Sequence, residues 1–341
     1  LIPSSFFLLE WVKSWMISGF PWLNLGIIFE SLWGLLPIVG VSGTSFVMLL
    51  IICAILEKNI YVKTVVPILF TGLLLFGPGH YQKISEENSD LTVTVVQPAN
   101  LGLDGLIELT NKADSNIVVW PEASAWYSGN AFSTDKRIIG GFFRREESKT
   151  FTAVIDASNG EGYNKHNLVP FGEFQPFGDL LIGINSFFNI PNSRISRGAF
   201  VQDKLNWSGL VCWELVFNNT FIERAKGTEF IIHVSNDSWY GSSMPAQHLK
   251  HARARSVESN KWVVRSTTDG LSQIISPQNE QSSKLLNRKE YGSITHTIKT
   301  NTDDTIYLKN IKDQNYKGID CNEEVALSQF EPLSVDLMIV P

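Results

Sequence analysis

The sequence predicts a layered α/β sandwich attached to membrane helices at its N-terminal end. Residues 1–80 contain long apolar runs with few charges, whereas the remainder has the composition of a soluble domain. In that second part, short apolar runs of strand length alternate with helix-length segments, which is the pattern of layered α/β domains. The 341 residues are enough for one large domain plus additional segments.

The first apolar stretches leave alternatives open. Ile2 to Phe20 carries Glu10 and Lys13, which lie three residues apart and therefore share one face of a helix. This predicts either a membrane helix whose polar face contacts other helices or an amphipathic helix in the membrane interface. Leu23 to Val41 is apolar but interrupted by Gly and Pro, and we expect it to be re-entrant or to lie on the membrane surface.

Thr44 to Leu56 and Val62 to Phe76 are the clearest membrane segments, because apolar flanks can extend each toward the ~20 residues that a spanning helix needs. Lys58 and Lys63 flank the short loop between them, and the positive-inside rule places this loop in the cytoplasm. Everything after Gly77 is then expected on the opposite side, the periplasm of a bacterium with two membranes. Residues 1–80 are thus predicted to form a membrane segment.

The remaining chain divides into a polar linker at 81–90, a catalytic domain at 91–310 and a polar tail at 311–341. Within the domain, the short continuously apolar runs are typical of strands buried on both faces. Strands are predicted at 91–97, 116–120, 137–143, 151–155, 207–213, 230–234, 261–265, 271–275 and, as a last strand, 305–308. Helices are predicted at 103–113, 179–188, 218–226 and 245–260, and the chain after 276 is otherwise low in pattern.

Three residues in this domain form a complete set for acyl transfer. Cys212 ends one apolar strand-like run and Glu122 directly follows another, so both are expected at strand ends that meet in one crevice. A carboxylate can take the proton of the thiol, and the ammonium of Lys165 can lower the pKa of the thiol and stabilise an oxyanion. Each residue also has a structural interpretation: Cys212 as inert core, Glu122 as a strand-end cap and Lys165 as a solvated loop charge.

Composition and spacing argue against several other classes of site. The net charge of −6 argues against a nucleic acid partner. The three cysteines have no CxxC spacing, so neither a zinc site nor a disulfide framework is suggested. His248 and His251 share a helix face, but a third metal ligand is not apparent, and a phosphate-binding loop is not recognisable. We therefore expect neither a metal nor a cofactor.

Four stretches carry a resemblance to a known family. They are Trp-Pro-Glu at 120–122, Tyr-Asn-Lys-His-Asn-Leu-Val-Pro-Phe-Gly-Glu-Phe at 163–174, Cys-Trp-Glu at 212–214 and Val-Ser-Asn-Asp-Ser-Trp-Tyr-Gly at 234–241. Together they resemble the nitrilase superfamily and, more narrowly, its membrane-bound branch, the apolipoprotein N-acyltransferases. Ser18 to Trp22 and Pro37 to Val41 resemble the membrane part of that branch, and the resemblance runs from about Phe6 to about Lys309.

The resemblance implies a nitrilase-like αββα sandwich and a Glu–Lys–Cys triad. Glu122 would be the general base, Lys165 the cation that stabilises the oxyanion, and Cys212 the nucleophile. Glu173 would support the site, and Glu214 would be the acid after the nucleophile. From the residues alone, each of the last two carboxylates could instead bind only backbone amides. The family has Cys-Tyr-Glu where this chain has Cys-Trp-Glu, so a phenol hydroxyl is absent beside the nucleophile.

The implied reaction moves an acyl chain from a phospholipid through a thioester on Cys212 to the α-amine of a diacylglyceryl apolipoprotein. The implied place is the bacterial inner membrane, with several membrane passes, a periplasmic catalytic domain and a monomeric state. Further membrane helices before Leu1 and one after the domain would be missing from this chain. Two alternatives remain from the sequence: a nitrilase-type amidase acting on a soluble amide, and a truncated membrane protein without catalysis.

Overall fold

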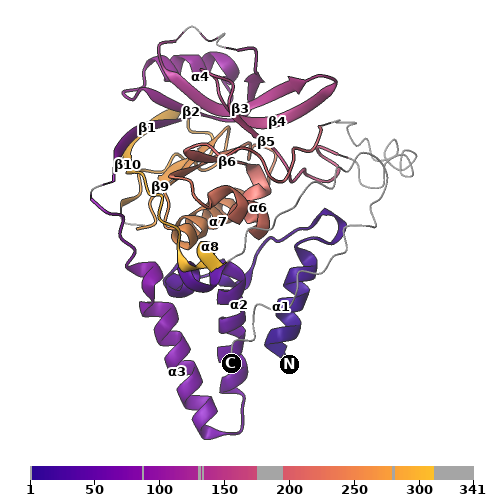
Figure 1. The fold of residues 1–341 in the computed structure, drawn as a ribbon, viewed down its shortest axis with the longest axis vertical. Coiled ribbons are helices and arrows are strands. Elements are labelled where there is room, and N and C mark those ends of the chain that lie inside the picture. Colours follow the sequence, from indigo (N-terminus) through magenta and orange to yellow (C-terminus); the bar gives the residue numbers. More distant parts are fainter. Residues whose placement is uncertain are drawn as a thin grey trace, which may run out of the picture.

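The computed structural model describes residues 2–86, 88–129, 132, 134–174, 195–278 and 281–310. Two β-sheets pack face to face, helices cover their outer sides, and the N-terminal helices extend from one end of the molecule (Figure 1). This arrangement confirms the predicted αββα sandwich with apolar N-terminal helices.

The first sheet has six strands in the order β10-β1-β2-β3-β4-β5, with β1, β2 and β3 parallel. The strands are β1 (Asp90–Gln97), β2 (Ile117–Trp126), β3 (Arg137–Glu146), β4 (Lys149–Asp156), β5 (Gly162–Asn164) and β10 (Gly292–Lys299). Helix α4 (Gly102–Asn111) covers its outer face (Figure 1). Val118 and Trp120 pack under this helix, whereas Val119 faces the second sheet, so β2 is buried on both faces as its apolar run predicts.

The second sheet has the order β6-β7-β8-β9, with β6, β7 and β8 parallel. Its strands are β6 (Trp207–Val211), β7 (Phe230–Ser235), β8 (Val263–Thr267) and β9 (Gln273–Ile275). Helices α6 (Asn218–Ala225) and α7 (Met244–Ser259) cover its outer side. Val211 and Val234 join the core between the sheets, while Leu210 and Ile231 pack toward the helices. The carboxyl ends of β6 and β7 therefore lie side by side.

Three helices precede the sandwich: α1 (Ile2–Lys13), α2 (Leu36–Ile55) and α3 (Ile60–Phe76). Two continuous helical stretches, Glu30–Ile55 and Ile60–His80, are long and apolar enough to cross a membrane. Short 3₁₀ turns at Leu25–Ile27 and Glu30–Leu35 connect α1 to α2. Apolar side chains of this connection and of α2 pack against α7, which attaches the N-terminal segment to the sandwich.

The structure corrects the prediction for the end of the domain. The predicted strand at 305–308 is part of a helix, α8 (Ile306–Asn310). Strand β10, at 292–299, lies in the region expected to be low in pattern and pairs antiparallel with β1. It is an edge strand whose outer face carries Ser and Thr side chains, and Ile294 and Ile298 are its only buried apolar side chains among the described residues. Two apolar residues are too few to produce a strand signal.

Smaller differences concern the ends of elements. Helix α1 ends at Lys13, short of the predicted Phe20, because a 3₁₀ turn and Gly19 with φ of +75° redirect the chain. The end of the 23–41 segment belongs to α2, which has a break at Gly40. Strand β2 continues past Pro121 to Trp126, with a register shift between Trp120 and Ala125. The predicted helix at 179–188 and the tail at 311–341 lie outside the described residues.

Candidate active site

The candidate nucleophile lies at a sharp turn directly after a buried strand. Cys212 follows β6 and begins the 3₁₀ turn Cys212–Val216, with a φ of +54°, a left-handed conformation that costs an L-residue roughly 1 kcal/mol or more. His233 and His248 each bring Nε2 to the carbonyl oxygen of Cys212, at 2.8 and 3.1 Å. His233 donates there, because its Nδ1 accepts a hydrogen bond from Arg265. The backbone of Cys212 is therefore fixed by a hydrogen bond to its carbonyl oxygen.

Glu214 fixes the same turn from the other side. One carboxylate oxygen accepts the amide of Val211 at 3.0 Å. The other accepts the Tyr163 hydroxyl at 2.8 Å and the amides of His166 and Asn167 at 2.7 and 2.9 Å. Glu214 is fully buried, so these four donors replace the water that its oxygens would otherwise bind. It connects the nucleophile turn to the loop that follows β5.

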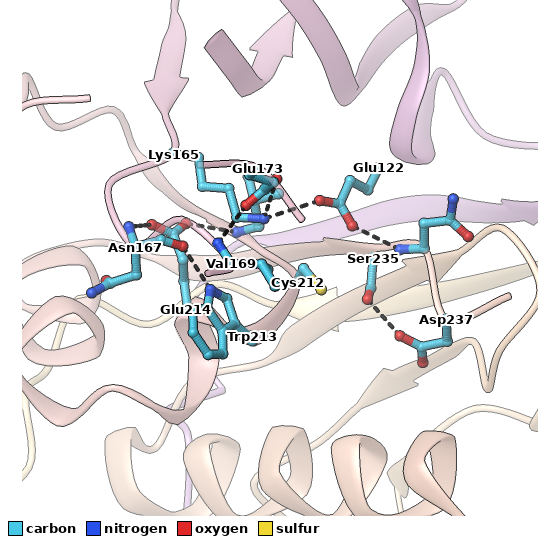
Figure 2. Close-up of polar contacts among 12 residues, drawn as sticks. Glu122, Lys165, Asn167, Val169, Glu173, Cys212, Trp213, Glu214, Ser235 and Asp237 are labelled. Carbon is cyan, nitrogen blue, oxygen red and sulfur yellow. Dashed lines mark hydrogen bonds and ion pairs between the residues drawn. The ribbon is translucent and has the colours of Figure 1, made fainter. Parts of the chain in front are cut away.

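That loop supplies the candidate cation. Lys165 Nζ lies 3.2 Å from Glu122 Oε1 and 2.8 Å from Glu173 Oε1, so one buried ammonium contacts two carboxylates (Figure 2). The second oxygen of Glu122 accepts the amide of Asn236 at 2.8 Å, and that of Glu173 accepts the amide of Val169 at 2.8 Å. Both carboxylates therefore have fixed orientations.

Burial and charge act in opposite directions on these groups. Burial raises the pKa of Glu122. The negative charge of Glu173 raises this pKa further, and Lys165 and the Asn236 amide oppose the increase only in part. Burial alone would lower the pKa of Lys165, but Glu122 and Glu173 outweigh it and hold this pKa well above its usual range. The ammonium consequently keeps its charge, and Glu122, whose pKa is raised, is the group in this pair that can exchange a proton.

Cys212 lies next to this charged cluster and is 1% exposed. Burial and the Glu122 carboxylate raise the pKa of its thiol, and Lys165 opposes them. At rest the thiol is therefore protonated, and it needs a base to become a nucleophile. The structure thus brings together all five residues that the sequence predicts, although Glu122 lies within β2, at its register shift, and not at a strand end. Cys212 directly follows β6, Glu214 belongs to the turn that Cys212 begins, and Lys165 and Glu173 lie in the loop after β5.

A second buried cluster lies behind the nucleophile. Asp237 accepts hydrogen bonds from Arg265 at 2.6 Å and from Ser235 at 2.6 Å, and it lies 3.1 Å from His248 Nδ1. Burial would raise the pKa of Asp237, but Arg265 and His248 hold it below its usual range. Asp237 and Arg265 are 28 residues apart and meet only in the folded sheet, so sequence spacing gives no signal for this cluster. Among the described residues, there is no group of three or more His, Cys, Asp or Glu side chains that could hold a metal ion.

An apolar pocket of about 430 Å³ lies beside the thiol. The N-terminal segment contributes Met16, Phe20 and Trp22, and the sandwich contributes Val169, Trp213 and Tyr240. The two parts are joined at this point by a 2.7 Å hydrogen bond from Trp22 Nε1 to Gln247 of α7. Val169 binds Glu173 and Tyr240 touches Cys212, so two residues of the pocket wall also contact the polar site.

Residues 135–306 match the family model of the carbon-nitrogen hydrolases. The chain belongs to the carbon-nitrogen hydrolase family. Cys212, Lys165 and Glu173 lie within the matched region of this family, and Glu122 precedes it. Residues 1–54 separately match the model of the apolipoprotein N-acyltransferase N-terminal domain, which indicates the branch of the family.

Relatives of this carbon-nitrogen hydrolase agree with that branch. The chain is 31% identical over 321 residues to an apolipoprotein N-acyltransferase of Photobacterium profundum, covering 80% of this chain and 62% of the relative. It is 31% identical over 320 residues to that of Vibrio parahaemolyticus, covering 80% and 63%. The chain therefore spans less than two thirds of the length of these relatives. A solved CN-hydrolase superfamily protein from Xanthomonas campestris is 18% identical, with a TM-score of 0.45, and covers 62% of this chain and 91% of that chain.

Proposed function

We propose that this chain is an apolipoprotein N-acyltransferase that moves an acyl chain from a phospholipid to the α-amine of a diacylglyceryl apolipoprotein. The observation that carries the proposal is the apolar pocket, which the N-terminal segment and the sandwich build jointly beside Cys212. A soluble amide has no need of such a pocket, whereas an acyl chain does. The relatives and the match at residues 1–54 support the same activity.

In the first half-reaction, the Glu122 carboxylate takes the thiol proton and Cys212 Sγ attacks the ester carbonyl carbon. The charge that develops on the carbonyl oxygen is stabilised by the ammonium of Lys165, which its two carboxylates keep in place. The C–O bond then breaks, and Glu122 returns its proton to the departing glycerol oxygen. A thioester on Cys212 and a lysophospholipid result.

In the second half-reaction, the α-amine of the apolipoprotein attacks the thioester carbon and passes a proton to Glu122. The C–S bond breaks, the amide product leaves, and the thiolate recovers its proton from Glu122. Glu173 holds Lys165 and the Val169 amide, and Glu214 holds the nucleophile turn, so both act as positioning residues. The cycle uses the chain's own residues throughout.

We further propose that the sandwich lies on the periplasmic side of the inner membrane and that the chain acts as a monomer. The two long apolar helices and the short lysine-containing loop between them support this placement. The pocket supports it as well, because a site at the junction of membrane segment and sandwich can receive a lipid laterally.

The first test is the acyl-enzyme itself. The full chain in detergent micelles is mixed with a phospholipid labelled in its acyl chain, and intact mass is measured. We expect an adduct of one acyl group that hydroxylamine removes, that Cys212→Ala abolishes, and that Cys53→Ala leaves unchanged. A folded protein that acquires no adduct would contradict the proposal. Hydrolysis of soluble amides by that same protein would favour the amidase alternative.

A further inference from the structure

Tyr240 occupies the boundary between the apolar pocket and the polar site. It follows β7 in the connection to α7, and its ring both lines the pocket and stacks on Trp239 at 5.1 Å with a 15° interplanar angle. Arg288 donates to its carbonyl oxygen at 3.2 Å, which fixes the backbone of this connection. A phenol in this position carries a polar group into an otherwise apolar wall.

The hydroxyl of Tyr240 points at the nucleophile. Its oxygen lies 3.8 Å from Cys212 Sγ, within the range of a hydrogen bond that involves sulfur. Ser235 also lies beside the thiol and lowers the thiol pKa, but in this structure its hydroxyl donates to Asp237 at 2.6 Å. The Tyr240 hydroxyl is therefore a second donor that can reach a sulfur anion at this position.

We propose that Tyr240 is a further catalytic residue, whose hydroxyl donates a hydrogen bond to the Cys212 thiolate. This inference rests on the proposed function for its role in turnover, but the contact itself concerns only the thiol. A phenol remains protonated at neutral pH, and burial together with the neighbouring Cys212 raises the pKa of Tyr240 further. The hydroxyl is thus a donor and not a competing base.

The hydrogen bond serves both half-reactions without a net proton transfer. Before attack, Glu122 holds the thiol proton and Tyr240 stabilises the sulfur anion that remains. During aminolysis the C–S bond breaks and its electron pair returns to sulfur, where the same hydroxyl stabilises the leaving thiolate. A donor that strengthens as charge develops on sulfur accelerates both steps.

The pH dependence of Cys212 reflects every charged group around it. Glu122 reaches it from β2, Lys165 from the loop after β5, Arg265 from β8, and Asp237 and Tyr240 from the connection after β7. Glu122 and Asp237 disfavour the thiolate, whereas the cations Lys165 and Arg265 favour it. Replacement of Tyr240 by Phe changes only the phenol hydroxyl and leaves these four charges in place.

The test measures the rate of Cys212 alkylation by iodoacetamide as a function of pH, using the full chain in detergent micelles and peptide mapping to separate Cys212 from the other cysteines. In Tyr240→Phe we expect the midpoint of the profile to rise by about half a pH unit to one unit, and the rate at neutral pH to fall about three- to ten-fold. The matched control is Tyr291→Phe, which removes a hydroxyl bonded to Gly105 on the surface of the sandwich.

An unchanged midpoint in a Tyr240→Phe protein with the melting temperature of the parent overturns the proposal. A lower midpoint also overturns it, because it means that the thiol is the donor and the phenol the acceptor. Should Tyr240→Phe melt early, Tyr240→Met provides a second side chain of similar length without a hydroxyl or an N–H donor, and the same outcomes apply. Iodoacetamide requires no lipid, so failure here is separate from failure to form the acyl-enzyme.

Discussion

At the scale of single residues, the site depends on a lysine that is buried with two carboxylates. Lys165 is 1% exposed, and a lysine is rarely buried to this extent unless it is paired. Glu122 and Glu173 provide the pairing, and each is held in turn by a backbone amide. Removal of Lys165 would leave two buried carboxylates without a counter-charge, so the three side chains form one unit.

The first prediction concerns the base. Because burial raises the pKa of Glu122, its carboxylate takes up a proton as the pH falls through that raised pKa, and the acylation rate should fall with it. In Glu122→Gln we expect the rate of adduct formation at neutral pH to fall by about 10²- to 10⁴-fold and the acidic limb of the profile to disappear. The measurement is the initial rate of acyl-enzyme formation across the acidic and neutral range.

Glu108→Gln is the matched control for this substitution, because Glu108 is a solvent-exposed carboxylate on α4. It should leave both the rate and the profile unchanged. An acidic limb that persists in Glu122→Gln would assign the titrating group elsewhere and contradict the role of Glu122 as the base.

At the scale of elements, α7 links the apolar helix α2 to the nucleophile turn. Glu258 accepts the amide of Val41 at 2.8 Å, just after the break at Gly40, and also pairs with Arg255. Arg255 in turn donates to the carbonyl oxygens of Leu215 and Val216, which belong to the turn that Cys212 begins. A continuous series of buried hydrogen bonds therefore connects the broken helix with the catalytic turn.

The second prediction concerns the break in α2. Gly40 has φ of +67° and ψ of −175°, a conformation open essentially to glycine, and a Cβ there would lie 2.4 Å from the Tyr307 ring and 2.8 Å from Glu258. Gly40→Ala should therefore lower the apparent melting temperature in detergent and slow acylation. Gly72→Ala in α3 is the control, because a Cβ there meets no atom within 4 Å and should be tolerated. Equal melting temperatures for the two variants would show that the break is not required.

The elements that could be predicted from the sequence are those with a continuous run of apolar side chains. The run through Val118 and Val119 is continuously apolar because both faces of β2 are covered, and it is recognisable for that reason. Strand β10 is held mainly by its pairing with β1, and pairing partners 200 residues apart leave no local pattern. The Glu, Lys and Cys of the candidate triad could be predicted from their chemistry. The contact between Tyr240 and Cys212 could not, because it depends on the conformation of the connection after β7, which the sequence pattern does not specify.

At the scale of the whole molecule, the helices α2 and α3 extend from one end of the sandwich (Figure 1). The pocket is lined by residues of both the N-terminal segment and the sandwich. Helix α3 exposes many large apolar side chains, including Val65, Ile68 and Leu69, as expected of a surface that faces lipid. In the proposed function the site lies at the level of the membrane surface, where an acyl chain remains in an apolar environment while its ester reaches the thiol.

The third prediction concerns sidedness. In a chain without its natural cysteines, a single cysteine replaces either Lys58, exposed in the loop between α2 and α3, or Ser158, exposed in the turn after β4. With intact spheroplasts of a bacterial host, a membrane-impermeant maleimide should label the position at 158 and leave the position at 58 unlabelled until the membrane is opened. The reverse pattern would place the sandwich in the cytoplasm and contradict the proposed periplasmic site.

The way in which the backbone of Cys212 is anchored matters for every step of the proposed reaction. The residue is anchored through its backbone, by the His233 imidazole on its carbonyl oxygen and by Glu214 on the preceding amide, and neither of these anchors uses the sulfur. In the proposed reaction the sulfur is in turn free, acylated and free again, yet these anchors can stay in place in all three states. In the proposed reaction the scaffold around Cys212 therefore needs no rearrangement between the donor and the acceptor step.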